Sequence, residues 1–98
     1  MPSEKRRAPR TGVVHKVQVT YVDEQGRDRF EIVKAEDVSR TGCRILLRHR
    51  CKPRTVIAIA LTPANSGSAT VRYQNPTPKG FVTGLEFLGG LTLPASAA

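Results

Sequence analysis

The stretch GVVHKVQVTYV (residues 12–22) decides the fold, because apolar and polar side chains alternate along it. Lys16, Gln18 and Thr20 stand between the apolar positions. A period of two places successive side chains on opposite faces, which is typical of a β-strand with one buried face. The sequence therefore predicts a half-buried strand here, and one side of it carries Val13, His15, Val17, Val19 and Tyr21.

The rest of the chain repeats this extended pattern in short runs. The segment DEQGRD (23–28) has turn-forming residues and RFEIVKAEDVS (29–39) resumes an extended pattern, which predicts a β-hairpin. No run shows a sustained helical period, and β-branched residues are frequent in the runs. We predict an all-β domain of six strands, either a small antiparallel barrel or a sandwich. The other four strands are expected at CRILLRH (43–49), TVIAIAL (55–61), ATVRYQ (69–74) and GFVTGLEFL (80–88).

The charge of the chain is strongly positive and unevenly distributed. Its 98 residues, enough for one domain, carry a net charge of +8. Fourteen of the sixteen Lys and Arg residues lie between positions 5 and 54. The run RTGCRILLRHRCKPR (40–54) has six cations and no acid. This asymmetry predicts a basic face and an anionic partner.

Several classes of protein are disfavoured by the composition. The only cysteines, Cys43 and Cys51, form no metal-ligand pattern and are expected to be reduced packing residues of a cytosolic protein. No apolar run approaches the ~20 residues of a membrane span, so the chain is expected to be soluble and cytoplasmic. His15 and His49 are not accompanied by a placed nucleophile. We therefore expect no enzymatic activity and no metal site.

The densest cluster of arginines lies in RRAPR (6–10), where regular structure is not expected. Arg6 and Arg10 stand four positions apart, and Pro9 stiffens the backbone between them. A guanidinium group can grip phosphate oxygens with two hydrogen bonds, stack on an aromatic ring, or donate to the O6 and N7 atoms of guanine. On this cluster alone, a solvated basic tail is the favoured interpretation, and binding of a nucleotide or another anion is the alternative.

A second motif, DVSRTG (37–42), lies between two expected strands. Asp37 and Ser39 are two positions apart, so at a strand end their side chains would project to the same side. The Asp37 carboxylate can accept hydrogen bonds from guanine N1–H and N2–H, and the Ser39 hydroxyl can donate or accept. Gly42 permits a turn with positive φ or a close approach of a ligand to the backbone. In isolation, an ordinary Asx or Ser/Thr turn is the favoured interpretation of this segment.

Together, the two motifs resemble those of the PilZ domain family. Residues 6–10 match RxxxR, and about thirty residues later residues 37–42 match [D/N]xSxxG. The closing GLEF (84–87) is similar to the family's last strand, so that the resemblance covers about residues 4–88. It implies a six-stranded antiparallel β-barrel of the split-barrel type that binds cyclic di-GMP, a bacterial second messenger, with no other cofactor.

The resemblance also implies roles for individual residues. Arg6 and Arg10 would hold the phosphates and a guanine from the N-terminal loop. Asp37 and Ser39 would meet guanine from the barrel surface, while Gly42 would shape the turn. The expected ligand-binding residues are Arg6, Arg7, Arg10, Asp37, Ser39, Arg40 and Gly42.

The two ends of the chain are expected to lie outside the barrel. PilZ domains commonly end in a helix over one barrel mouth, whereas LTLPASAA (91–98) is a poor helix sequence, so little or no C-terminal helix is expected. We divide the chain into a flexible basic loop (1–12), a PilZ-like barrel (13–90) and a flexible tail (91–98). Lys5 and Arg7 flank Arg6, the first arginine of the motif, and this basic character is similar to that of family members that take up an intercalated pair of ligand molecules.

The predicted function is a cyclic di-GMP sensor that passes the signal to an unidentified protein partner. Its mechanism would be a population shift, because the ligand contacts exist only when the N-terminal loop is closed. The runner-up is a basic barrel that binds single-stranded nucleic acid, which needs aromatic residues on the surface. A third hypothesis is a PilZ-like interaction module without ligand binding, which the intact motifs oppose. The aromatic residues of the chain are Tyr21, Phe30, Tyr73, Phe81 and Phe87. Most of them are expected in the core, which disfavours the nucleic-acid hypothesis.

Overall fold

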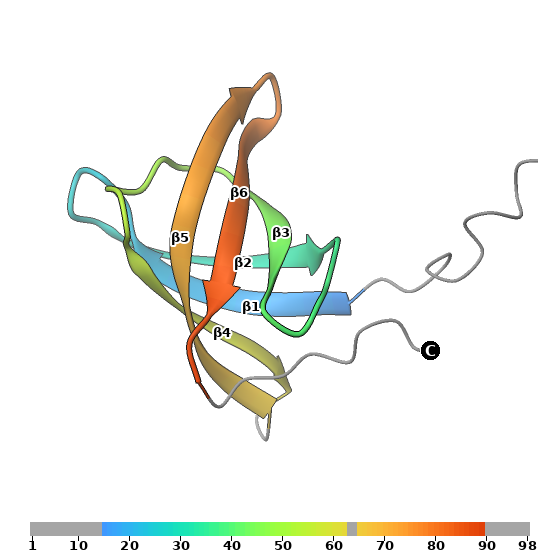
Figure 1. Cartoon of the computed structure of the whole chain (residues 1–98). Coiled ribbons are helices and arrows are strands. Elements are labelled where there is room, and N and C mark those ends of the chain that lie inside the picture. The colour runs from blue at the N-terminus through green and yellow to red at the C-terminus, as the bar shows by residue number, and fades with distance from the viewer. Residues whose placement is uncertain (1–14, 63–64, 90–98) are drawn as a thin grey trace, which may run out of the picture.

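Six antiparallel strands form one curled sheet in the computed structural model, which describes residues 15–62 and 65–89 (Figure 1). The strands are β1 (His15–Val22), β2 (Asp28–Ala35), β3 (Gly42–Leu47), β4 (Val56–Thr62), β5 (Asn65–Thr77) and β6 (Gly80–Phe87). Their order in the sheet is β2-β1-β4-β5-β6-β3, and all neighbours are antiparallel. The predicted all-β class with six antiparallel strands is confirmed.

The first hairpin forms as predicted, and Asp23 stabilises its turn. β1 and β2 pair along their whole length. The Asp23 carboxylate accepts hydrogen bonds from the backbone N–H groups of Gln25 (2.9 Å) and Arg27 (3.0 Å). It also accepts one from Nε of Arg29 at 2.8 Å. Gly26 supplies a positive φ of 86° that a residue with a side chain rarely adopts.

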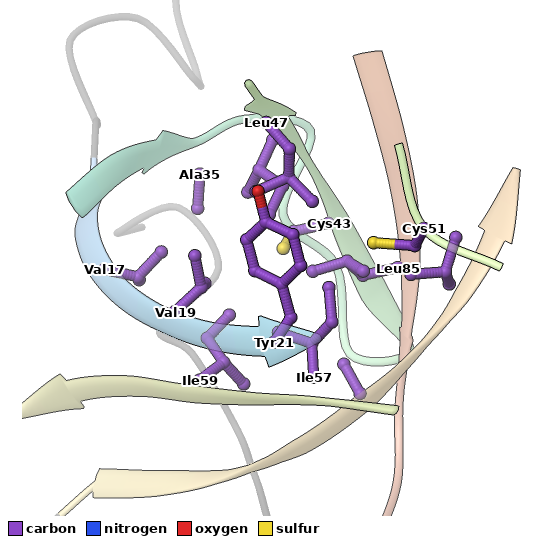
Figure 2. Close-up of a cluster of buried hydrophobic side chains, with 13 residues drawn as sticks. Val17, Val19, Tyr21, Ala35, Cys43, Leu47, Cys51, Ile57, Ile59 and Leu85 are labelled. Carbon is purple, nitrogen blue, oxygen red and sulfur yellow. The ribbon is translucent and has the colours of Figure 1, made fainter. Parts of the chain in front are cut away.

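The core lies on the concave side of the curled sheet and receives side chains from all six strands (Figure 2). From β1, the residues Val17, Val19 and Tyr21 are at most 2% exposed, as the period of two predicts. Figure 2 shows the ring of Tyr21 in the middle of the cluster. The other strands contribute Ala35, Cys43, Ile45, Leu47, Ile57, Ile59, Ala69, Val71 and Leu85.

Cys43 and Cys51 are free, buried packing residues, as predicted. Both belong to the core cluster drawn in Figure 2. Burial raises the pKa of each thiol to about 11, so both stay protonated at neutral pH. A protonated, buried thiol is a poor nucleophile.

The edge strands β2 and β3 meet along a seam without forming a continuous ladder. At one end of the seam, the backbones of Glu36 and Arg44 exchange two hydrogen bonds of 2.8 Å. Further along, the Glu31 carboxylate accepts hydrogen bonds from the Arg48 backbone N–H and from the hydroxyl of Tyr21. Burial, together with this hydrogen bond to Glu31, raises the pKa of Tyr21. The sheet is therefore a half-barrel whose seam is held by a few contacts.

Two strands and two aromatic side chains differ from the prediction. β2 ends at Ala35 rather than continuing to Ser39, and β5 extends over 13 residues. Phe30 and Tyr73 lie on the surface instead of in the core. Phe30 occupies the outer side of the edge strand β2, and a register shift in β5 turns Tyr73 outward. The predicted basic loop (1–12) and tail (91–98) lie outside the described residues.

Candidate functional site

The second motif forms the loop between β2 and β3. Asp37 has a positive φ of 51°, a conformation that aspartate tolerates better than most residues. The Ser39 backbone N–H donates to the Gly42 carbonyl oxygen (2.9 Å), and the Thr41 N–H donates to Ser39 Oγ (3.2 Å). The strand-end geometry predicted for Asp37 and Ser39 is therefore not observed, and a compact turn carries both residues.

An arginine on β3 holds the Asp37 carboxylate. Arg44 Nη1 lies 2.6 Å from Asp37 Oδ2, and Arg44 Nη2 lies 3.4 Å from Glu36 Oε1. The side chains of Arg44 and Asp37 are 39% and 53% exposed, so both remain accessible to a ligand. The pair places a carboxylate that accepts hydrogen bonds (Asp37) beside a planar guanidinium group that donates them (Arg44) on the surface.

Gly42 is required by packing between strands rather than by the dihedral angles of the turn. Its φ is not positive, so the first predicted reason for this glycine is wrong. A methyl group at Gly42 would fall 2.0 Å from the backbone oxygen of Leu85 on β6. The close approach that the glycine permits is thus to the neighbouring strand.

Arg44, Gly84 and Tyr73 form a row across the outer face of β3, β6 and β5. Gly84 pairs with Arg44 on one side and with Tyr73 on the other. A methyl group at Gly84 would fall 2.1 Å from Cε2 of Tyr73, so the tyrosine ring occupies the space above the glycine. The register shift between Val71 and Tyr73 is a β-bulge that brings this ring to the outer face.

The loop and this row line a pocket of about 240 Å³. It offers a carboxylate, two hydroxyl groups, guanidinium groups and an exposed aromatic ring. This set of groups suits a ligand that carries both a purine base and negative charge. The lining side chains that supply these groups are Asp37, Ser39, Thr41, Arg44, Arg72 and Tyr73.

The structure brings together three of the predicted site residues. Asp37, Ser39 and Gly42 line the pocket. Arg40 belongs to the same loop, but its side chain is exposed and makes no ion pair within the described part of the chain. The predicted residues outside the described ranges are Arg6, Arg7 and Arg10.

The expected set of ligand-binding residues did not include Arg44, Arg72 and Tyr73, which line the pocket. Arg44 stands two positions after Gly42, and the period of two along β3 could have placed it beside the motif. Tyr73 has no such signal, because the β-bulge that exposes it depends on the pairing of β5 with β6.

β1 begins beside the loop between β2 and β3 (Figure 1). His15 pairs with Ala35 at the end of β2, two residues before Asp37. The start of β1 therefore lies beside the second motif.

Comparison with protein families agrees with this fold. The family model described as PilZ domain matches residues 4–95, which is nearly the whole chain and includes both motifs. This chain belongs to the PilZ family. PilZ domains in general bind cyclic di-GMP and are binding modules rather than catalysts. The search of curated proteins and the search of solved structures each found no match.

Two further observations concern residues 15–62 and 65–89. This part of the chain has no helix with the length and apolar character needed to traverse a bilayer. The same residues form no group of three or more His, Cys, Asp or Glu side chains suited to a metal ion.

Proposed function

We propose that this chain is a cytoplasmic sensor of cyclic di-GMP. In this proposal, the loop between β2 and β3 recognises a guanine base of the ligand. Asp37 accepts hydrogen bonds from guanine N1–H and N2–H, and Ser39 adds a hydroxyl contact. Gly42 keeps the loop against β6, where a side chain would collide with the Leu85 backbone. Arg40 adds positive charge at the rim of the site.

The observation that carries this proposal is the pairing of His15 with Ala35. It fixes the start of β1 next to the loop that holds Asp37. The segment that connects the arginine motif to β1 therefore joins the barrel at the candidate site. Arg6 and Arg10 then clasp phosphates and a guanine from the side opposite Asp37, and Arg7 adds charge.

The signal arises from closure of the N-terminal segment over the ligand. Because the arginine contacts exist only in the closed state, ligand binding shifts the population toward it. A downstream protein partner then distinguishes the closed state from the open one. The ligand supplies charge-assisted hydrogen bonds and stacking that offset the entropy lost on ordering the segment.

Isothermal titration calorimetry with cyclic di-GMP, and with GTP as a control ligand, tests this proposal. We expect Arg10→Ala and Asp37→Ala each to weaken binding by about 2–3 kcal/mol, or roughly a hundredfold, because each removes a charged hydrogen-bonding partner. Arg27→Ala is the matched control, since Arg27 is exposed and lies outside the pocket. Unchanged affinity in both site variants would refute the assignment.

The same titration measures the stoichiometry. We propose two intercalated ligand molecules per chain, because Lys5 and Arg7 add charge beside the first motif. A ratio of one ligand per chain removes the intercalated pair and leaves the site assignment intact.

Single-stranded nucleic acid is the second candidate ligand, favoured by the exposed rings of Phe30 and Tyr73 and by the net charge of +8. Stacking on such rings tolerates any base, and phosphate contacts make the affinity strongly dependent on salt. Oligonucleotide binding that falls steeply with salt, without preference for the cyclic dinucleotide, would favour this candidate.

A further inference from the structure

A second and larger cavity lies along the seam between β2 and β3. It has a volume of about 880 Å³ and lies next to the ligand pocket, with which it shares Arg44. Its walls are the two edge strands, and β6 contributes Val82. We call this cavity the seam groove. The proposed binding of cyclic di-GMP makes no use of it beyond Arg44.

The seam groove contains three large apolar side chains that are exposed. Phe30 and Ile32 on β2 are each 60% exposed, and Leu46 on β3 is 39% exposed. All three side chains line the groove together with Val82, which pairs directly with Leu46. Apolar side chains gathered in one concave surface, rather than scattered singly, are typical of an interaction site.

Cations outnumber acids around this apolar surface, and three of the cations are unpaired among the described residues. Lys34, Arg48 and Lys79 line the groove, and their side chains make no ion pair in the part of the chain that the structure describes. Of the three acids there, Glu31 accepts the hydrogen bonds across the seam and Glu36 contacts Arg44, which leaves Asp28 as the one lining acid in neither kind of contact among the described residues. A partner with carboxylates would neutralise cations that this chain leaves unmatched.

We propose that the seam groove is a docking site for a segment of another protein in which apolar side chains are flanked by Asp and Glu. The apolar side chains would cover Phe30, Ile32 and Leu46, while the carboxylates would meet the cations on the rim. A second copy of this chain is a poor occupant, because each copy carries a net charge of +8. The basic segment around Arg6 and Arg10 is repelled for the same reason.

Peptide selection on the full chain tests this proposal without presupposing a partner. A displayed library of random short peptides is selected on the wild-type protein, with counter-selection on Ile32→Glu. Val56→Glu is the matched control, because Val56 is an exposed β-branched residue (55%) that does not line the groove. We expect enriched peptides that combine apolar residues with Asp or Glu. Fluorescence anisotropy should show about tenfold or greater weakening by Ile32→Glu and no change with Val56→Glu.

Three outcomes would overturn the docking site. They are enrichment of basic or uncharged peptides, enrichment of no peptide, and binding that Ile32→Glu leaves unchanged. Self-association of the wild type that Ile32→Glu abolishes would assign the groove to a second copy instead. Because Ile32 does not line the ligand pocket, this variant should retain cyclic di-GMP binding, so failure of the docking site and failure of the proposed sensor function are separable.

Discussion

Arg44 Nη1 lies 2.6 Å from Asp37 Oδ2, and this ion pair spans the loop and the strand that together form the ligand pocket. Both side chains are partly exposed, so the pair contributes less than about 1 kcal/mol to the stability of the fold. Its consequence is orientation: the pair holds the Asp37 carboxylate in place beside the pocket. Arg44 also lines the seam groove, so it contacts both surfaces that we assign to binding.

Replacement of Arg44 should therefore affect ligand binding more than folding. We expect Arg44→Ala to weaken cyclic di-GMP binding by roughly tenfold or more, in line with the about 1.5–3 kcal/mol of a hydrogen bond to a charged group. The free energy of unfolding should change by less than about 1 kcal/mol. Calorimetry and urea titration measure the two effects. Arg50→Ala is the control, because Arg50 pairs with Glu24 and does not line the pocket. An equal loss of cyclic di-GMP affinity in the two variants would contradict a specific role of Arg44 in binding.

The fold was largely predictable because its main signal is local. Alternation along β1 marks Val17, Val19 and Tyr21 as one buried face, and turn residues separate the strands. The β-bulge in β5 was not predictable, since it arises from pairing with β6. One extra residue there reverses the alternation, so that Val71 is buried while Tyr73 is exposed.

For the candidate site, the sequence predicted which motif residues take part but not how they are arranged in space. The motif identifies Asp37 and Ser39, but the turn that presents them depends on hydrogen bonds within the loop. The contribution of Arg44 and Tyr73 depends on strands that are distant in sequence and meet at Gly84. Cross-strand register decides such contacts, and a single sequence does not specify it.

Gly42 should prove to be a packing residue. In Gly42→Ala the new methyl group would meet the Leu85 backbone oxygen at 2.0 Å, so β3 and β6 must separate. We expect a loss of about 1–3 kcal/mol in the free energy of unfolding, the usual range for an overpacked position. Gly89→Ala is the matched control, because no atom of the described residues lies within 4 Å of its added methyl group. Similar urea midpoints for the two variants would argue against this packing role.

The hairpin turn should make folding sensitive to acid through Asp23. Hydrogen bonds from the Arg27 backbone and the Arg29 side chain lower the pKa of Asp23 from 3.8 to about 2. The ionised carboxylate therefore stabilises the fold above pH 3.8, and this contribution is lost as the pH falls through about 2. Urea unfolding of Asp23→Asn should show a lower stability at neutral pH and a weaker dependence on pH in this window.

Asp28→Asn serves as the control for that measurement, because Asp28 is an exposed carboxylate of the same hairpin. Its pH profile should follow that of the wild type. The free energy of unfolding of Asp23→Asn could instead depend on pH as steeply as that of the wild type between pH 3.8 and about pH 2. In that case the hydrogen bonds to Asp23 do not control the acid response.

Tyr73 should stack on a base of the bound ligand, because its exposed ring borders the pocket that contains Asp37. Base stacking on an aromatic side chain contributes about 1–3 kcal/mol, so Tyr73→Leu should weaken cyclic di-GMP binding by roughly five- to a hundredfold. Tyr73→Phe keeps the ring and should retain the affinity. Gly84→Ala should weaken binding as well, since its methyl group would displace the ring.

Intrinsic fluorescence can report this contact directly. The chain has two tyrosines and no tryptophan, and Tyr21 is buried, so quenching by an added ligand reports on Tyr73. We expect cyclic di-GMP to quench the wild type, and the response to disappear in Tyr73→Phe although calorimetry still detects binding. Binding without quenching in the wild type, at an affinity that Tyr73→Leu does not change, would place the base away from this ring.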